Sequence, residues 1–91
     1  MRDPADTRAL HRRINRIMGQ LRGIDKMIDD EDALTEDILI QINATKAALH
    51  KTGQALLELH LSSCVHAHTD PESAQAAIDE FSKAVELFSR I

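Results

Sequence analysis

Apolar residues recur along the chain at helical spacing, in three blocks separated by polar stretches. In the first block their spacing alternates between four and three residues, through Leu10, Ile14, Ile17, Leu21, Ile24 and Ile28. Because this repeat places the side chains along one stripe of a helix, it predicts a helix that packs against other helices. Asp3 and Pro4 supply a capping residue and a first helical residue. The acidic run at residues 29–32 is unfavourable at a helix C-terminus, so we predict a helix over residues 4–30.

The second block predicts a long helix over residues 35–65, about 45 Å in length. Thr35 is the expected cap, with two acidic residues in the first turn. One apolar stripe contains Ile38, Ile42, Thr45, Leu49, Thr52, Leu56 and Leu59, and Leu39, Leu57 and Leu61 widen it. Gly53 inside a helix costs up to about 1 kcal/mol relative to Ala, which indicates a close approach of another element or a bend.

The third block begins with Asp70 and Pro71, a second cap followed by a first helical residue. Its stripe contains Ala74, Ile78, Phe81, Val85 and Phe88, which predicts a helix over residues 71–90. No stretch alternates with the two-residue period of a strand. The predicted fold class is therefore all-α, with a long antiparallel helical hairpin and a shorter C-terminal helix in one domain over residues 1–91.

These apolar arcs are too wide for a chain of 91 residues to bury by itself. We therefore predict an obligate oligomer in which the second helix is central to the contact. No apolar run approaches the length that spans a membrane, and the charged start "MRDPADTRALHRR" lacks the apolar core of a secretory signal. Both observations favour a cytoplasmic protein without a membrane partner.

The net charge of −4 is unevenly distributed. Residues 1–26 contain seven basic and three acidic side chains, a net of +4, and the remainder contains four basic and twelve acidic ones, a net of −8. This asymmetry is typical of a first segment that meets a polyanion, and equally of an ordinary solvated helix face. The chain lacks Trp and Tyr, which argues against a surface that stacks on bases.

Candidate chemistry gathers near the end of the second helix. Cys64 is the only cysteine, which excludes an intrachain disulfide, and His60 precedes it by four residues. Residues four apart share a helix face, so the imidazole and the thiol can meet one ligand. Two side chains alone make a poor metal site, and the question becomes where a third ligand lies.

Three stretches resemble one known family in their order and spacing. "RRINRIMGQLRGIDKMI" (12–28), "ILIQINATKAAL" (38–49) and "LLELHLSSCV" (56–65) are similar to the CsoR/RcnR family of bacterial transcriptional repressors, which includes the FrmR and CstR types. The resemblance covers nearly the whole chain. It implies a three-helix protomer that assembles as a dimer of dimers and leaves its operator when an inducer binds. Inducers in this family are Cu(I), Ni(II) or Co(II), formaldehyde, and sulfane sulfur.

The resemblance also implies a DNA-binding surface for double-stranded operator DNA. Arg12, Arg13 and Arg16 match the basic positions of the family's first helix, and Lys46 stands where relatives often have Arg. In a tetramer the positive first segment is repeated fourfold, which gives a broad cationic surface for phosphates. The alternative for Lys46 is an ordinary exposed lysine.

The inducer site departs from the family pattern. In metal-sensing relatives a cysteine at the start of the second helix joins a histidine and a cysteine or histidine near the end of that helix in another protomer. His60 and Cys64 match the second and third positions, but Thr35 occupies the first. A hydroxyl is a poor ligand for soft Cu(I), which prefers thiolates. Formaldehyde sensors react through the same first cysteine, and sulfur sensors use two cysteines.

Three interpretations of the pair therefore remain. In the first, it binds Cu(I), Ni(II), Co(II) or Zn(II) with a replacement ligand such as His66 or His68, and Glu80 matches a glutamate that relatives place beside the ligand histidine. In the second, Cys64 is a reactive thiol open to persulfidation or to an intermolecular disulfide. In the third, the pair is structural, because a buried cysteine often behaves as a small apolar side chain.

Two other classes of protein compete with a repressor. A helical oligomeric interaction module explains the heptads without DNA binding, whereas a repressor loses affinity for DNA steeply as salt rises. An enzyme requires a general base and a substrate cleft, and the chain has no Gly-rich or paired-carboxylate signature. We therefore predict a non-enzymatic DNA-binding repressor with a transition metal as inducer, and a thiol-based sensor as the alternative.

Overall fold

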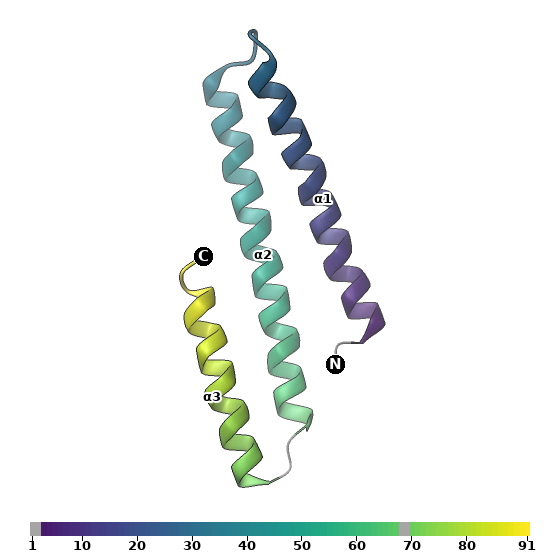
Figure 1. Ribbon diagram of the computed structural model, residues 1–91, viewed down its shortest axis with the longest axis vertical. Helices are drawn as coiled ribbons and strands as arrows, with labels where there is room; N and C mark the ends of the chain where they lie inside the picture. The colour runs from purple at the N-terminus through teal and green to yellow at the C-terminus, as the bar shows by residue number, and fades with distance from the viewer. Residues whose placement is uncertain (1–2, 68–69) are drawn as a thin grey trace.

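A computed structural model describes residues 3–67 and 70–91 of the chain, with side chains described for residues 3–64 and 70–91. It contains three helices: α1 (Pro4–Asp29), α2 (Thr35–Ala67) and α3 (Pro71–Phe88). Figure 1 shows α1 and α2 as an antiparallel hairpin, with α3 returning along the other side of α2. The predicted all-α, three-helix protomer is therefore confirmed. Within the described ranges, no helix is long and apolar enough to cross a membrane.

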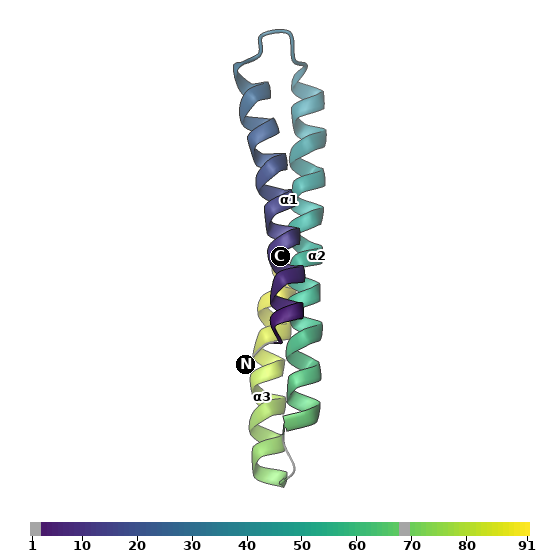
Figure 2. The same ribbon diagram turned by 90° about the vertical axis from the view of Figure 1, so that its right-hand side faces the viewer.

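The three helices lie side by side in a single layer. The molecule measures 61 × 27 × 12 Å, and its smallest dimension is about the diameter of one helix with its side chains. The edge-on view in Figure 2 shows this thin shape. Both α1 and α3 pack against α2, and they make no contact with each other in the described part of the chain. Such a layer has two broad faces that no other part of residues 3–67 and 70–91 covers.

Two of the helices begin at the predicted aspartate–proline pairs. The Asp3 carboxylate accepts a hydrogen bond from the Ala5 amide at 2.7 Å, and the Asp70 carboxylate accepts one from the Ser73 amide at 2.8 Å. The bonds to Ser73 lower the pKa of Asp70 below its ordinary value of 3.8. These caps satisfy amide groups that have no partner within their own helix.

The start of α2 differs from the prediction, because Thr35 is the first helical residue and not the cap. The Leu34 carbonyl accepts the first hydrogen bonds, from the Asp37 amide at 3.0 Å and the Ile38 amide at 3.2 Å. Glu36 and Asp37 lie in the first turn, where their negative charge interacts favourably with the positive end of the helix dipole. Acidic side chains near the N-terminus thus take the place of a side-chain cap.

The core is small and lies mostly between α1 and α2. Ile17 and Ile24 are buried from α1, Thr45 from α2 and Ala77 from α3. The Thr45 hydroxyl donates to the Gln41 carbonyl at 2.8 Å, so its burial leaves no unpaired donor. Among the described residues, these four are the whole buried set.

In each heptad of the hairpin, one of the two stripe positions is covered within the protomer and the other is exposed. In α1, Ile17 and Ile24 face α2, whereas Ile14, Leu21 and Ile28 remain 37%, 51% and 64% exposed. The α2 residues Ile42, Leu49 and Leu56 are also spaced by seven and exposed. We call these six residues the open stripe. The sequence predicted one continuous seam per helix, and the hairpin divides each seam into a covered and an uncovered half.

Gly53 marks the predicted close approach of another element. A Cβ atom at this position would lie 3.4 Å from two ring carbons of Phe88 and 3.5 Å from the Ile91 Cδ1. Gly19 and Gly23 have no such neighbour within 4 Å. The C-terminal end of α3 therefore packs directly on the α2 backbone at Gly53, where an added methyl group would be in van der Waals contact with Phe88 and Ile91.

Candidate functional site

His60 and Cys64 meet near the C-terminal end of α2. The Cys64 Sγ lies 3.9 Å from the His60 Nε2, and both side chains are partly buried. Metal bonds of about 2.3 Å to sulfur and about 2.0 Å to nitrogen allow two donors of one ion to lie at most about 4.3 Å apart. The observed separation of 3.9 Å lies within this limit. An imidazole and a thiolate together suit Cu(I), Zn(II), Ni(II) or Co(II).

Helix α3 lies over this pair. The Cys64 thiol donates a weak hydrogen bond to the Ala77 carbonyl at 3.9 Å. The ring centroids of His60 and Phe81 are 6.0 Å apart, with the planes tilted by 32°. The two candidate ligands thus lie between the helix that carries them and the middle of α3.

A second site is a groove between α1 and α2, with a volume of about 390 Å³. Its walls carry Arg13, Arg16 and Gln20 from α1 and Lys51 and Thr52 from α2. The small residues Ala44, Ala47 and Ala48 also line it, which leaves room between the longer side chains. The groove therefore brings three basic side chains from two helices to one place.

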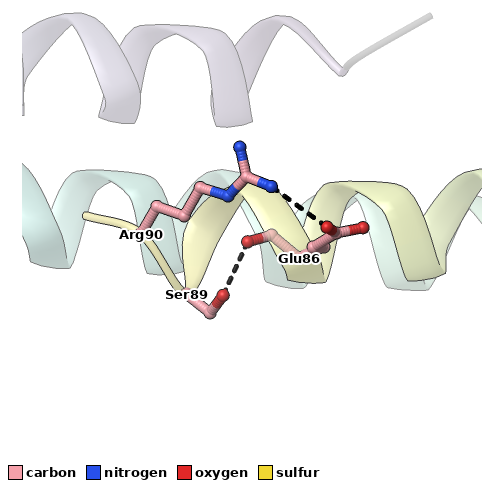
Figure 3. Close-up of polar contacts among 3 residues, drawn as sticks. All are labelled: Glu86, Ser89 and Arg90. Carbon is pink, nitrogen blue, oxygen red and sulfur yellow. Dashed lines mark hydrogen bonds and ion pairs between the residues drawn. The ribbon is translucent and has the colours of Figure 1, made fainter.

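No acidic side chain lines this groove. Among the described residues, the one ion pair joins Arg90 Nη2, just after the end of α3, to Glu86 Oε1 at 3.1 Å. Figure 3 draws this pair. Arg13, Arg16 and Lys51 therefore carry charges that no carboxylate in the described chain neutralises. Unpaired cations that converge on a groove attract phosphate oxygens.

The sequence of the chain was compared with those of known proteins. The family described as "Metal-sensitive transcriptional repressor" matches residues 6–87. This chain belongs to the metal-sensitive transcriptional repressor family.

Two characterised members of the family show the extent of the similarity. The copper-sensing transcriptional repressor CsoR of Bacillus subtilis is 36% identical over 78 residues, which cover 86% of this chain and 76% of that protein. The copper-sensing transcriptional repressor RicR of Mycobacterium tuberculosis is 46% identical over 54 residues, which cover 59% of this chain and 55% of that protein. The matched region thus spans about half the length of RicR. No solved structure matches the chain significantly.

Membership of the metal-sensitive repressor family confirms the resemblance found in the sequence. The family is one of transcriptional repressors. The structure has further placed His60 and Cys64 together, as their spacing predicted.

The third metal ligand is not present within one described protomer. No group of three His, Cys, Asp or Glu side chains lies close enough to hold a metal ion in the parts of the chain that the structure describes. Glu80 is exposed on α3, next to Phe81. Thr35 is separated from His60 by 25 residues of α2, or about 38 Å. The side chain of His66 and the whole of His68 lie outside the described residues.

The structure adds groove residues that sequence reasoning missed. Lys51 and Gln20 line the groove beside Arg13 and Arg16, and the Oε1 of Gln20 is buried without a hydrogen-bond partner. Arg12 and Lys46 are exposed on the same two helices but do not line the groove. The signal available for Lys51 was its position beside Thr52, an inward position of the second-helix stripe.

Proposed function

We propose that the chain is a DNA-binding transcriptional repressor that a transition metal releases from its operator. The observation that carries the DNA-binding part is the groove between α1 and α2, which three unpaired basic side chains line without an acid. Family membership supports the same function, because the family is one of metal-sensitive repressors. As such a repressor, it would act in the cytoplasm on double-stranded operator DNA.

The groove accounts for how an acidic protein meets a polyanion. Arg13, Arg16 and Lys51 offer positive charge to backbone phosphates, and Arg12 and Lys46 extend the positive surface along the same helices. Phosphate contacts release counterions, so the affinity falls with rising salt. These contacts position the protein and carry little sequence information by themselves.

The open stripe supports assembly from several copies. Its six apolar residues run along both helices of the hairpin at heptad spacing and remain uncovered in the protomer. Two hairpins that bury these stripes against each other form a four-helix bundle of ordinary geometry. We propose this bundle as the dimer, and a dimer of dimers as the unit that presents several grooves to DNA.

Assembly would also bring further candidate ligands to the metal site, which is incomplete within one protomer. If two α2 helices pack in opposite directions, the first turn of one copy approaches the end of α2 in the other. Thr35, Glu36 and Asp37 then come near His60 and Cys64, and His66 or His68 offers imidazole ligands from the same end. Thr35 removes one thiolate from the family pattern, which shifts the donor set from Cu(I) towards Ni(II), Co(II) or Zn(II).

The proposed inducer is therefore a transition metal such as Cu(I) or Ni(II). The copper-sensing relatives support Cu(I), and the harder donors around Thr35 support Ni(II). A bound ion releases DNA only if it binds the DNA-free arrangement of the subunits more tightly than the DNA-bound one. Held between α2 and α3, the ion would act on the arrangement of the helices and not on the groove directly.

A His60→Ala variant tests the metal-sensing part of this function. It is expected to bind operator DNA like the wild type and to remain bound when metal is added, because one of the two placed ligands is gone. Fluorescence anisotropy on labelled operator DNA, with Lys83→Ala as an exposed control on α3, measures both properties. Equal metal-driven release from the variant and the wild type would contradict the proposed metal site.

A second candidate function is thiol-based sensing. The observation that favours it is the Cys64 thiol, which is free, partly exposed and 3.9 Å from the His60 Nε2. In that case a sulfane-sulfur donor releases DNA from the wild type without metal, and Cys64→Ser abolishes the response. A release that depends on metal alone would remove this candidate.

A further inference from the structure

Within one protomer, helix α3 packs against a single neighbouring helix. It packs against α2 and makes no contact with α1 within the described residues. Its middle lies over the candidate ligands, with the Ala77 carbonyl 3.9 Å from the Cys64 Sγ and the Phe81 and His60 ring centroids 6.0 Å apart. Movement of α3 away from α2 would therefore uncover both ligands at once.

The last turn of α3 makes a separate contact with α2. The Phe88 ring packs on the His50 ring with a centroid distance of 4.7 Å and a tilt of 35°. Phe88 and Ile91 also lie against Gly53, where a Cβ atom would be 3.4 to 3.5 Å from their carbons. We call this contact of Phe88 and Ile91 with His50 and Gly53 the latch.

Two cavities flank the line along which α3 meets α2. One has a volume of about 350 Å³ and is lined by residues that include Leu57, His60 and Phe88. The other measures about 440 Å³ and is lined by residues that include His50, Leu57 and Phe88. Leu57 and Phe88 line both, so the packed contact between the cavities is narrow. A helix held by few apolar contacts opens at a lower free energy than the rest of a fold.

We propose that α3 is a lid over the His60–Cys64 pair, held closed by the latch, and that it opens as a unit to admit the inducer. The admission of an inducer rests on the proposed function. The packing of α3 over the His60–Cys64 pair, and its opening, do not. The latch acts at a distance, because eleven residues of helix separate Gly53 from Cys64, or about 16 Å. A change at the latch therefore alters access to the thiol through the position of α3 or through the cavity that Phe88 shares with His60.

The reactivity of Cys64 tests this lid without metal or DNA. Reduced protein is mixed with excess aromatic disulfide (DTNB), and the Cys64 thiolate displaces one aryl thiolate to form a mixed disulfide. The released aryl thiolate reports the rate. Phe88→Ala is expected to raise the rate about tenfold or more, because truncation of a packed Phe weakens the latch. Lys83→Ala, exposed on α3 and absent from the latch, is expected to leave the rate unchanged.

A variant with the opposite expected effect guards against simple unfolding. Gly53→Ala places a methyl group at contact distance from Phe88, which strengthens the latch and is expected to lower the rate. Circular dichroism and size-exclusion chromatography check that every variant keeps its helices and its assembly. If Phe88→Ala fails either check, Phe88→Leu replaces it, with a smaller expected rise.

Equal rates for wild type and all folded latch variants would overturn the lid. That result would leave the repressor function untouched, because the assay contains neither operator nor metal. Conversely, failure of the wild-type protein to bind DNA, with a thiol that reacts faster in Phe88→Ala and more slowly in Gly53→Ala, would support the lid and contradict the repressor function.

Discussion

At the scale of single residues, Lys51 is the side chain whose role the structure changes most. It lies on the α2 wall of the groove, opposite Arg13 and Arg16 on α1, and no carboxylate lines the groove. Three convergent cations bind a phosphate oxygen more strongly than one isolated lysine does. The groove therefore predicts a larger contribution to DNA binding from Lys51 than from Lys46, which is exposed outside it.

Lys51→Ala tests this ranking. The variant is expected to lower the affinity for operator DNA about tenfold and to reduce the salt dependence by about one unit of slope for each lost phosphate contact in the assembly. Lys46→Ala is the matched control, with a smaller expected loss. Anisotropy titrations at several salt concentrations give both numbers. An unchanged slope for Lys51→Ala would place the DNA elsewhere.

The pairing of His60 with Cys64 could be predicted from sequence, whereas the groove could not. Spacing of four on a helix fixes which side chains share a face, so this pair followed from its positions alone. The groove depends on how α1 packs along α2, and the heptad pattern leaves that register open. For the same reason the sequence could not place Lys51 opposite Arg16.

At the scale of the helices, the Asp70 cap makes the stability of the start of α3 depend on pH. The Ser73 hydrogen bonds lower its pKa, so the folded protein binds this proton less tightly than the unfolded chain. The cap therefore contributes its full stability above the ordinary pKa of 3.8 and loses it as the pH falls through the lowered value.

Asp70→Asn tests this cap. Asparagine keeps the capping acceptor but does not titrate, so the variant is expected to keep α3 at neutral pH and to lose this part of the acid sensitivity. Hydrogen exchange of the α3 amides, followed from neutral pH to below 3.8, measures it. Protection that falls equally in both proteins would show that other carboxylates control the acid response.

The caps of α1 and α3 could be predicted from the sequence, whereas for α2 the starting position was predicted but Thr35 is not the cap. Asp–Pro pairs specify both the cap and the first helical residue, because proline fits the first turn and leaves few alternatives. Thr35 has no proline beside it, and a threonine is accepted either as a cap or inside the first turn. The path of the chain out of the acidic turn decided between these positions, and it made Leu34 the residue before the helix.

At the scale of the whole molecule, the open stripe is the feature that a lone protomer does not explain. A layer one helix thick leaves large apolar side chains in water on both α1 and α2. Burial of apolar surface contributes about 25 cal/mol per Å², so several such side chains favour a second copy. The sequence predicted an oligomer from its wide apolar arcs, and the structure shows which residues are left for the contact.

Leu49→Lys tests the stripe. It introduces a charge at an apolar position on α2 that is 46% exposed in the protomer, and it is expected to dissociate the assembly and lower the urea midpoint. Gln54→Lys, at an exposed polar position of the same helix, is the control and is expected to change neither. Analytical ultracentrifugation gives the mass. An unchanged assembly of Leu49→Lys would move the interface to another face.

We propose that the groove binds DNA and that metal at the His60–Cys64 pair releases it, and one titration tests both steps. Reduced wild-type protein is bound, without oxygen, to labelled DNA from upstream of its own gene and titrated with Cu(I) and, separately, Ni(II). We expect the protein to bind DNA in a salt-sensitive way and then to release it near one ion per protomer, because each protomer supplies one His60–Cys64 pair. Absence of DNA binding would contradict the repressor function, and binding that survives saturation with both metals would contradict metal sensing.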